Sequence, residues 1–276
     1  MDLQKFGGCT RYRKGRDIRC TRMDGAGLWR RDRYTIIWLT RGILIWKRPR
    51  VRRERHMSAG IQDFVMLTGI IIKAEPIGEY DRRVVLLTKE RGKISAFAKG
   101  SRRPGNRLMA PTNPFSFGQF KLYAGRSAYN MSDAEITNYF EELRQDFAGA
   151  YYGMYFLEIC DYYTRENNDE LGMLKLIYQS LRALTSPNFD NRLVRYIFEL
   201  KSIMINGEFP GFDAGDVLME PTAFTVDYIM KTPVEKLFSF QVRTEVLDEL
   251  GLYSRKMCKR IMDRDFKSLE ILENIN

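Results

Sequence analysis

The sequence predicts an α+β multidomain protein in which a small five-stranded β-barrel precedes an all-α domain. Short β-branched and alternating segments occupy residues 57–138, whereas apolar residues at helical spacing occupy residues 139–276. The first 56 residues stand apart, because they hold all three tryptophans, the single histidine, and 17 basic against 5 acidic residues. We therefore expect two folded domains behind a basic N-terminal extension.

The composition excludes several classes of protein. The 276 residues carry a formal net charge of +10 and are 44% hydrophobic, which is enough for packed cores. The one histidine, His56, lies in the extension, so no histidine-based catalytic site is expected and the chain is not predicted to be an enzyme. The apolar runs are too short for a membrane span, and the scattered cysteines favour a reducing cytoplasm over a disulfide framework.

The extension, residues 1–56, shows no sustained hydrophobic period before Ile36–Trp46. One interpretation is a basic arm that binds nucleic acid. The interpretation we favour is a poorly ordered upstream stretch that is not needed for function. In that case Met57 or Met66 is the native start.

Five segments of residues 57–138 have the pattern of strands. They are Leu67–Ala74, Val84–Thr88, Ile94–Lys99, Phe117–Tyr123 and Tyr129–Ile136. Gly78 and Gly92 lie in the turns between the first three segments, and Gly92 can adopt a positive φ. Five short strands indicate a closed barrel, and the oligonucleotide/oligosaccharide-binding (OB) fold is the natural match by strand number.

The connection Lys99–Arg107, between the third and fourth strands, carries four positive charges and no negative one. Its glycines and proline are typical of a flexible loop, and its guanidinium groups suit a phosphate backbone. Other basic residues of the same small domain add to this charge: Arg82, Arg83, Lys93, Lys121 and Arg126. We favour a nucleic-acid contact over a merely solvated loop, and we expect Tyr80 and Tyr129 to be exposed for base stacking.

Residues 139–276 are predicted to be helical. The expected helices are Tyr139–Arg165, Leu171–Leu184, Asn191–Asn206 and Val242–Arg264. Asn188 is the expected cap of the third helix, and Thr232–Glu235 is the expected capping box of a short one. The stretch 207–231, with its glycines and proline, is expected to be an irregular link. The aromatic pairs of the first helix are expected in the core rather than in a groove.

Several separated segments resemble the family of the bacterial DNA repair protein RecO. In the predicted barrel they are Gly69–Ala74, Gly78–Ile94 and Ala98–Arg103. Further along, Tyr139–Asp146, Asn206–Gly207, Leu237–Phe238 and Arg264–Leu272 follow in the family's order. The resemblance runs from about Met66 to Leu272 and leaves out the extension.

The resemblance implies an OB-fold barrel and a helical domain in a recombination mediator. Such a protein binds single- and double-stranded DNA, anneals complementary strands without ATP and acts with RecR. It helps to load RecA onto DNA coated with single-strand-binding protein, whose acidic C-terminal tail it recognises through the helical domain. The residues that match the family's basic positions are the expected DNA contacts: Arg82, Lys93, Lys99, Arg102, Arg103 and Arg107. The competing interpretation is a protein-interaction adaptor whose barrel has no direct role with DNA.

The sequence departs from the family at the zinc site that many members carry after the Asn-Gly segment. Residues 207–257 contain neither cysteine nor histidine, so we predict no zinc and no other cofactor. A carboxylate-metal nuclease is disfavoured, because nothing in the spacing of the helical carboxylates fixes a metal geometry.

The charge distribution separates a DNA-binding part from a partner-binding part. Residues 57–138 carry a net charge of +5 and residues 139–276 a net charge of −7, so the barrel can hold phosphates while the helical domain avoids DNA. Contacts to the DNA backbone predict sequence-tolerant binding by a cytoplasmic, nucleoid-associated protein. Lys175 and Arg182, on one helix face, are the candidates for binding the partner's tail.

Overall fold

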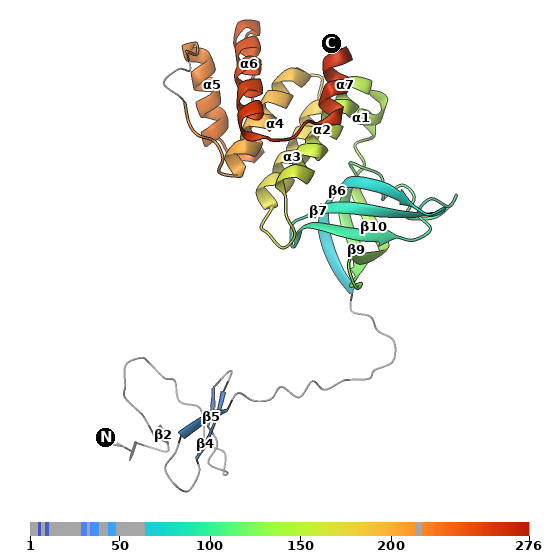
Figure 1. Ribbon diagram of the computed structural model, residues 1–276, viewed down its shortest axis with the longest axis vertical. Helices are drawn as coiled ribbons and strands as arrows, with labels where there is room; N and C mark the ends of the chain where they lie inside the picture. Colours follow the sequence, from blue (N-terminus) through green and yellow to red (C-terminus); the bar gives the residue numbers. More distant parts are fainter. Residues whose placement is uncertain are drawn as a thin grey trace. The chain divides into compact units, whose positions relative to one another are not determined.

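The computed structural model describes residues 64–212 and 217–275, together with the backbone of short strands within residues 5–47 (Figure 1). The chain divides into two compact units, residues 1–61 and 62–276. In the first unit, β1 pairs with β2 and β3-β4-β5 form a separate sheet, with these bounds: Lys5–Phe6, Cys9–Thr10, Trp29–Arg31, Tyr34–Trp38 and Leu44–Lys47. Most of residues 1–56 lie outside the described residues. Their predicted lack of order and of function therefore stays a prediction.

Residues 64–138 form a closed barrel with the strand order β10-β8-β7-β6-β9. Its strands are β6 Phe64–Ile77, β7 Asp81–Thr88, β8 Gly92–Ala98, β9 Phe117–Tyr123 and β10 Tyr129–Asn138. Neighbouring strands pair antiparallel except β10 and β8, which pair in parallel and close the barrel. The five predicted strands and the OB-fold class are confirmed.

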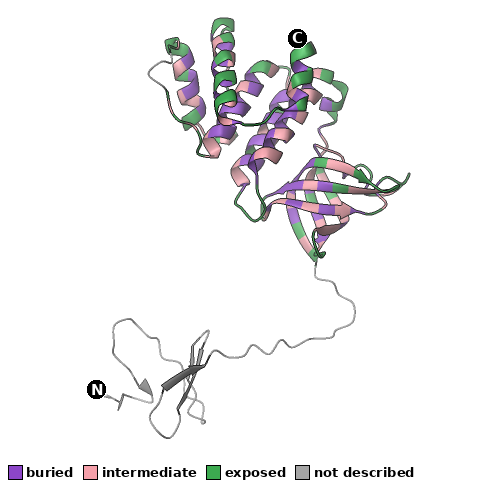
Figure 2. Ribbon diagram, in the orientation of Figure 1, coloured by how far each residue is buried: buried purple, intermediate pink, exposed green. Residues whose placement is uncertain are grey.

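The barrel core follows from the alternation of side chains along each strand. On β8, Ile94, Ala96 and Ala98 are buried inside, whereas the residues between them are half-buried on the outer face. Figure 2 shows buried residues interspersed with less buried ones along the barrel strands. The long strand β6 is shared by two ladders, and a register shift after Ile71 lets it bend between them. Gly118 is required where β9 pairs with β10, because a Cβ there would lie 2.1 Å from the carbonyl oxygen of Glu135.

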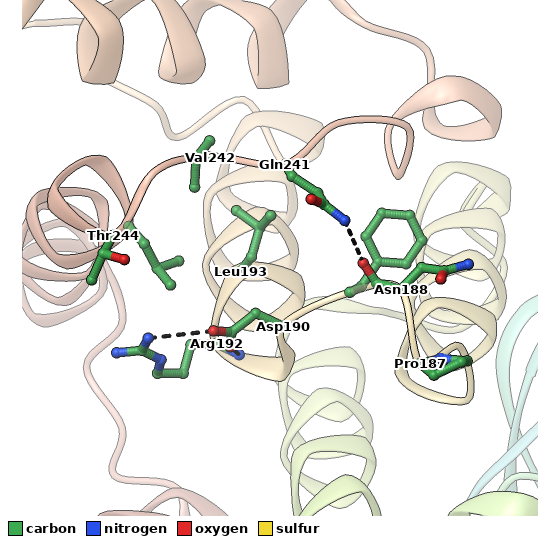
Figure 3. Close-up of a pocket in the computed structure, with 10 residues that line it drawn as sticks. Pro187, Asn188, Asp190, Arg192, Leu193, Gln241, Val242 and Thr244 are labelled. Atoms are coloured by element: carbon green, nitrogen blue, oxygen red, sulfur yellow. Dashed lines mark hydrogen bonds and ion pairs between the residues drawn. The ribbon is translucent and has the colours of Figure 1, made fainter.

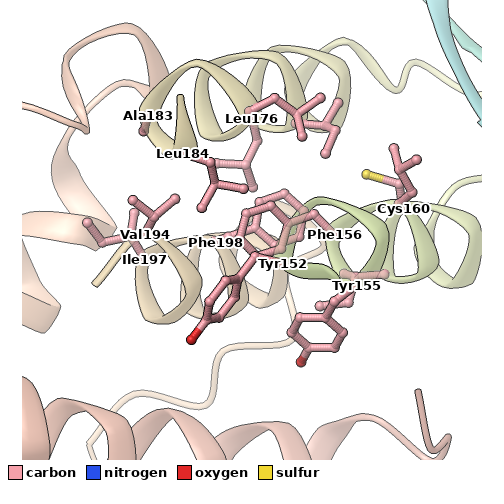
Figure 4. Close-up of a cluster of buried hydrophobic side chains, with 14 of the residues drawn as sticks. Tyr152, Tyr155, Phe156, Cys160, Leu176, Ala183, Leu184, Val194, Ile197 and Phe198 are labelled. Atoms are coloured by element: carbon pink, nitrogen blue, oxygen red, sulfur yellow. The ribbon is translucent and has the colours of Figure 1, made fainter. Parts of the chain in front are cut away.

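The helical domain packs around a core of aromatic and aliphatic side chains. Its elements are α1 Glu141–Gln145, α2 Phe147–Tyr163, α3 Leu171–Leu184, α4 Asn191–Ile205, α5 Glu220–Lys231, η1 Val234–Lys236, α6 Thr244–Ile261 and α7 Lys267–Ile275. The rings of Phe156 on α2 and Phe198 on α4 stack with centroids 4.2 Å apart (Figure 4). Tyr152 and Tyr155 are buried with them, so the predicted core role of the aromatic pairs is confirmed there.

The predicted helix Tyr139–Arg165 is wrong as one element. Asp146, with φ −100° and ψ 108°, is extended and separates α1 from α2. Because of this break, Phe147 does not share a buried face with Leu143; it is 61% exposed, whereas Leu143 is buried. The predicted cap Asn188 is also wrong, since the carboxylate of Asp190 accepts the Arg192 amide at 2.7 Å and begins α4.

The stretch 207–231 is only partly irregular, which corrects the prediction of a link. Helix α5 occupies its second half and begins at Glu220, with Pro221 in its first turn, where proline is compatible with a helix. The Nζ of the buried Lys201 donates to the carbonyls of Ile229, Met230 and Thr232 at 2.8–3.0 Å and so holds the end of α5. The residue before η1 is Pro233 rather than Thr232, no side chain caps this single 3₁₀ turn, and the amide of Thr232 instead donates to Tyr228 at the end of α5, so the predicted capping box is wrong.

The barrel and the helices share one interface. Apolar side chains from the barrel, among them Ile70 and Leu87, belong to the same buried cluster as the helical core. The β7–β8 turn also pairs with the segment after α2, since the amide of Lys93 donates to the carbonyl of Arg165 and that of Asn167 to the carbonyl of Arg91, both at 3.0 Å. The two domains therefore make backbone as well as side-chain contacts.

Candidate nucleic-acid interface

At one end of the barrel, the β6–β7 turn meets the connection that follows β8. The amide of Gly100 donates to the carboxylate Oδ1 of Asp81 at 2.7 Å, and the amide of Arg102 donates to the carbonyl of Tyr80 at 2.9 Å. The amide of Arg103 donates in turn to the carbonyl of Gly100 at 2.9 Å. Composition alone predicts a flexible loop, but these bonds hold residues 100–103 against the β6–β7 turn.

Three of the predicted DNA contacts are exposed at this junction. The Cζ of Arg103 lies 4.7 Å from the ring centroid of Tyr80, which is a cation–π contact. Arg102 donates from Nη1 to the carbonyl of Gly78 at 3.3 Å. Lys99 is exposed at the start of the same loop. We call this group the loop–turn site: Tyr80, Arg102, Arg103 and Lys99.

Arg82 lies beside the loop–turn site but has a structural partner. Its Nη1 donates to the carbonyl of Met109, the hydroxyl of Thr112 and the side-chain oxygen of Asn113, at 2.8–3.1 Å. Burial lowers the pKa of Arg82, and repulsion from the Arg102 guanidinium lowers it further. Arg82 therefore anchors residues 109–113 of the segment between β8 and β9, and it also adds positive charge next to Arg102.

The remaining two predicted contacts lie apart from the loop–turn site. Lys93 faces the helical domain, where its Nζ donates to the Asp161 carbonyl at 2.6 Å and carboxylate at 3.0 Å. Arg107 extends toward β10, donating to the carbonyl of Ser132 at 2.7 Å and contacting the carboxylate of Asp133 at 3.4 Å. The sequence could not separate these residues from the others, because a positive charge in a strand pattern does not reveal its partner.

The aromatic residues divide between the core and the surface. Tyr80 is 38% exposed, as predicted, whereas Tyr129 is half-buried and its hydroxyl accepts from Arg91 Nη1. Sequence reasoning missed Phe64, an aromatic residue of the barrel that is 49% exposed. It lies beside Tyr123, and the Nζ of Lys121 is 4.2 Å from its ring centroid. It lies at the start of β6, before the strand that the sequence predicted, so no period could identify it.

The predicted tail-binding residues of the helical domain are not brought together in a pocket. Lys175 is paired with Glu235 at 2.7 Å, and Arg182 is exposed near the end of α3. A hollow of about 400 Å³ lies nearby, between the α3–α4 connection and the start of α6 (Figure 3). Its lining combines apolar side chains such as Phe189, Leu193 and Leu247 with charged and polar ones.

Arg192 is the cationic residue of this hollow. Its guanidinium lies 3.3 Å from the carboxylate of Asp190 (Figure 3). It lies 3.3 Å from the carboxylate of Asp248 as well. Across the hollow, Gln241 donates to the carbonyl of Asn188 at 2.9 Å. A residue that lines an apolar hollow at a helix start carries no distinctive sequence signal, so Arg192 was not among the predicted site residues.

No metal centre is found within the described residues. These ranges hold no group of three or more histidine, cysteine, aspartate or glutamate side chains that could bind a metal ion. Cys160 is a free, buried thiol, and Cys258 is free and half-buried. Among the helices that the structure describes, none is long and apolar enough to cross a bilayer.

Fold and site together define an OB-fold protein with an all-α C-terminal domain and a cationic barrel end. Two family models match this organisation, recombination protein O N terminal over residues 63–140 and recombination protein O C terminal over residues 144–215. The chain belongs to the recombination protein O (RecO) family, which implies a role in DNA repair and recombination. The resemblance inferred from the sequence is thus confirmed.

Individual relatives agree with the family models. The DNA repair protein RecO of Acetivibrio thermocellus is 26% identical over 246 residues, which cover 78% of this chain and 98% of that protein. RecO of Symbiobacterium thermophilum is 36% identical over 146 residues, or 53% of this chain and 58% of that protein. RecO of Alkaliphilus metalliredigens is 32% identical over 142 residues, or 51% and 58%. The first of these matches spans the barrel and the helical domain together.

Proposed function

We propose that the chain is a non-enzymatic recombination mediator that binds single- and double-stranded DNA through the loop–turn site. It anneals complementary strands without ATP. Together with RecR, it helps to load RecA onto DNA coated with single-strand-binding protein. The proposed location of this activity is the cytoplasm, in association with the nucleoid.

One observation carries the proposal: two exposed guanidinium groups and an exposed tyrosine ring converge at one end of an OB-fold barrel. Arg102 and Arg103 offer forks that match phosphate oxygens, and Tyr80 offers a face on which a base can stack. Arg82 and Arg102 repel each other in the free protein, so a phosphate bound between them relieves that repulsion. The alternative, a protein adaptor without a DNA role, does not account for this combination.

Annealing follows from screening rather than from catalysis. Contacts to phosphates carry no base information, so the site accepts any sequence and leaves base edges free to pair. Two complementary strands repel through their backbones, and cationic side chains lower that repulsion. Pairing of the bases then supplies the free energy, so no nucleotide hydrolysis is needed.

The helical domain is the proposed partner-binding part. An acidic, apolar tail requires an apolar hollow with a cation at its rim, and the hollow beside Arg192 has this composition (Figure 3). Lys175 and Arg182 remain the candidates predicted from sequence. Binding of a fluorescent tail peptide to Lys175→Glu and Arg192→Glu variants distinguishes the two positions. Loss of binding in neither variant places the tail elsewhere on the protein.

The proposed function is tested by annealing of complementary single strands without ATP, with a titration of salt. In the Arg102→Ala/Arg103→Ala variant, annealing should fall for every sequence. Each lost phosphate contact should flatten the slope of log K against log salt by about 0.7 for single strands. The matched control is Lys236→Ala/Arg243→Ala, which removes the same charge from exposed positions of the helical domain and should anneal normally.

Two outcomes contradict the proposal in different ways. Unchanged affinity of the double variant at low salt removes the loop–turn site from the mechanism. No binding of DNA by the wild-type chain favours the adaptor. The fragment of residues 57–276, assayed beside the full chain, also tests the extension: equal annealing marks residues 1–56 as dispensable, whereas annealing by the full chain alone makes them a DNA-binding arm.

A further inference from the structure

We propose that Asp81 is the positioning residue of the loop–turn site. Its carboxylate fixes the cationic loop on the β6–β7 turn, so an acidic side chain strengthens the binding of an anionic ligand. This inference rests on the proposed function, because it concerns the same phosphate-binding surface. It assigns to Asp81 a role opposite to the one that its charge alone would give.

The carboxylate extends the barrel's hydrogen bonding beyond the end of a ladder. The last paired residues of β7 and β8 are Arg82 and Ala98. Beyond this pair the main chain that follows β8 leaves the ladder. The amide of Gly100 donates to Oδ1 of Asp81 at 2.7 Å instead of to a backbone carbonyl. A short charge-assisted bond of this kind is stronger than a neutral one. The first turn of the loop is therefore tied to β7 by a side chain.

The positions of both guanidinium groups follow from this tie. Gly100 has φ 68°, and its carbonyl accepts the amide of Arg103 at 2.9 Å. The amide of Arg102, between them, donates to the carbonyl of Tyr80 at 2.9 Å. One chain of bonds thus runs from Asp81 through Gly100 to Arg103, which brings its guanidinium over the Tyr80 ring. Without the acceptor at Asp81, the loop loses the bond that sets this register.

The charge of Asp81 argues the other way. A carboxylate close to bound phosphates repels them, so Coulomb's law alone predicts tighter DNA binding when it is removed. If Asp81 acted only through its charge, its removal would therefore tighten the binding of DNA. The geometry predicts weaker binding when the acceptor is lost, and unchanged or tighter binding when only the charge is lost.

Three substitutions in the full chain separate the acceptor from the charge. Asp81→Ala removes both and should bind a labelled oligothymidine about tenfold more weakly, with a flatter salt dependence. Asp81→Asn keeps an oxygen acceptor without the charge and should bind at least as tightly as wild type. Asp81→Glu keeps the charge but moves the acceptor by one methylene, and it should bind more weakly. If Asp81→Ala does not fold, Asp81→Glu tests whether the position of the acceptor matters.

Glu135→Ala is the matched control, because it removes an exposed carboxylate of the same barrel and should leave binding unchanged or slightly tighter. If Asp81→Ala binds as tightly as wild type while Arg102→Ala/Arg103→Ala binds weakly, the positioning role is wrong and the proposed function stands. Weakening of Asp81→Asn to the level of Asp81→Ala also overturns it. If the arginine variant binds normally as well, the loop–turn site itself is wrong.

Discussion

The guanidinium of Arg103 lies over the ring of Tyr80, with Cζ 4.7 Å from the ring centroid. The two residues come from different segments, the loop after β8 and the turn between β6 and β7. In the proposed function, Arg103 contacts a phosphate and Tyr80 stacks on a base at the same point. We therefore expect the site to favour a strand whose bases are unpaired, because only those bases can reach the ring.

The first prediction concerns Tyr80. Tyr80→Ala should weaken binding of single-stranded oligonucleotides by about 1–3 kcal/mol, the usual contribution of one stacked base. Tyr80→Phe keeps the ring and should bind like wild type, and duplex affinity should change much less in both variants. Fluorescence anisotropy with labelled single strands and duplexes measures these effects. Phe224→Ala, which removes a 68% exposed ring from α5, is the control. Equal losses for single strand and duplex would argue against stacking.

The second prediction concerns Gly92, at the contact between the barrel and the helical domain. Gly92 has φ 62°, and a Cβ there would lie 2.5 Å from the carbonyl oxygen of Arg165 and 2.7 Å from that of Asn168. Gly92→Ala should therefore lower the free energy of unfolding by about 2–4 kcal/mol, through both backbone strain and displacement of that segment.

Gly105→Ala provides the matched control for the second prediction. Gly105 has φ 77°, but apart from its chain neighbours no residue lies within 4 Å of its Cβ position, so only the backbone strain of about 1–2 kcal/mol applies. Urea denaturation of the two variants measures the difference. Equal destabilisation would mean that the interface adjusts to the added methyl group at no cost.

The third prediction concerns the buried carboxylate of Glu199, which joins three helices. It accepts from Tyr155 on α2 and Arg195 on α4, both at 2.8 Å, and from Ser254 on α6 at 2.5 Å. Glu199→Ala leaves the guanidinium of Arg195 buried without its main partner, and it should destabilise the protein by about 3–5 kcal/mol. Denaturant unfolding measures this loss.

Two further variants show whether the loss at Glu199 comes from the unpaired charge. Arg195→Met/Glu199→Leu removes both charges and should cost less than Glu199→Ala, because apolar residues often replace a buried ion pair without a large penalty. Glu245→Ala, an exposed carboxylate in the first turn of α6, should change stability by less than about 1 kcal/mol. A double variant as unstable as Glu199→Ala would assign the loss to packing.

The sequence predicted those parts of the fold that periodicity determines. The barrel strands and α3 were found because their apolar residues alternate or recur at helical spacing. It did not predict the break at Asp146, where one extended residue interrupts an otherwise apolar helix. Helix α5 was missed because Pro221 was interpreted as a breaker, although proline at a helix start is compatible with the helix.

The sequence indicated where positive charge gathers on the barrel, but it did not indicate which of these charges are paired. A cluster of positive charge in Lys99–Arg107 could be seen from composition. The pairing of Lys93 with Asp161, 68 residues away, could not, since it depends on how the barrel docks on α2. For the same reason, the role of Asp81 is apparent only in three dimensions: its acceptor faces an amide 19 residues further along the chain.

The last prediction concerns stability at alkaline pH and the thiol of Cys160. Cys160 is fully buried in α2, and burial raises the pKa of its thiol far above the usual 9.0. The carboxylates of Asp161 and Glu170 raise this pKa further, while Lys93 lowers it slightly. In the folded chain the thiol keeps its proton, whereas in the unfolded chain it ionises near pH 9.0. Its contribution to stability is therefore complete below that pH and is lost as the pH rises toward the folded pKa.

Above about pH 9, the free energy of unfolding should fall by up to about 1.4 kcal/mol per pH unit for this one proton. Cys160→Ala should be less stable than wild type at neutral pH, because it leaves a small cavity, but its stability should decline less steeply with pH. Denaturant unfolding in a reducing buffer, from about pH 7 to about pH 10, gives both slopes. The same slope in both proteins would show that the decline comes from other buried groups, such as Tyr155, whose pKa is also raised by burial.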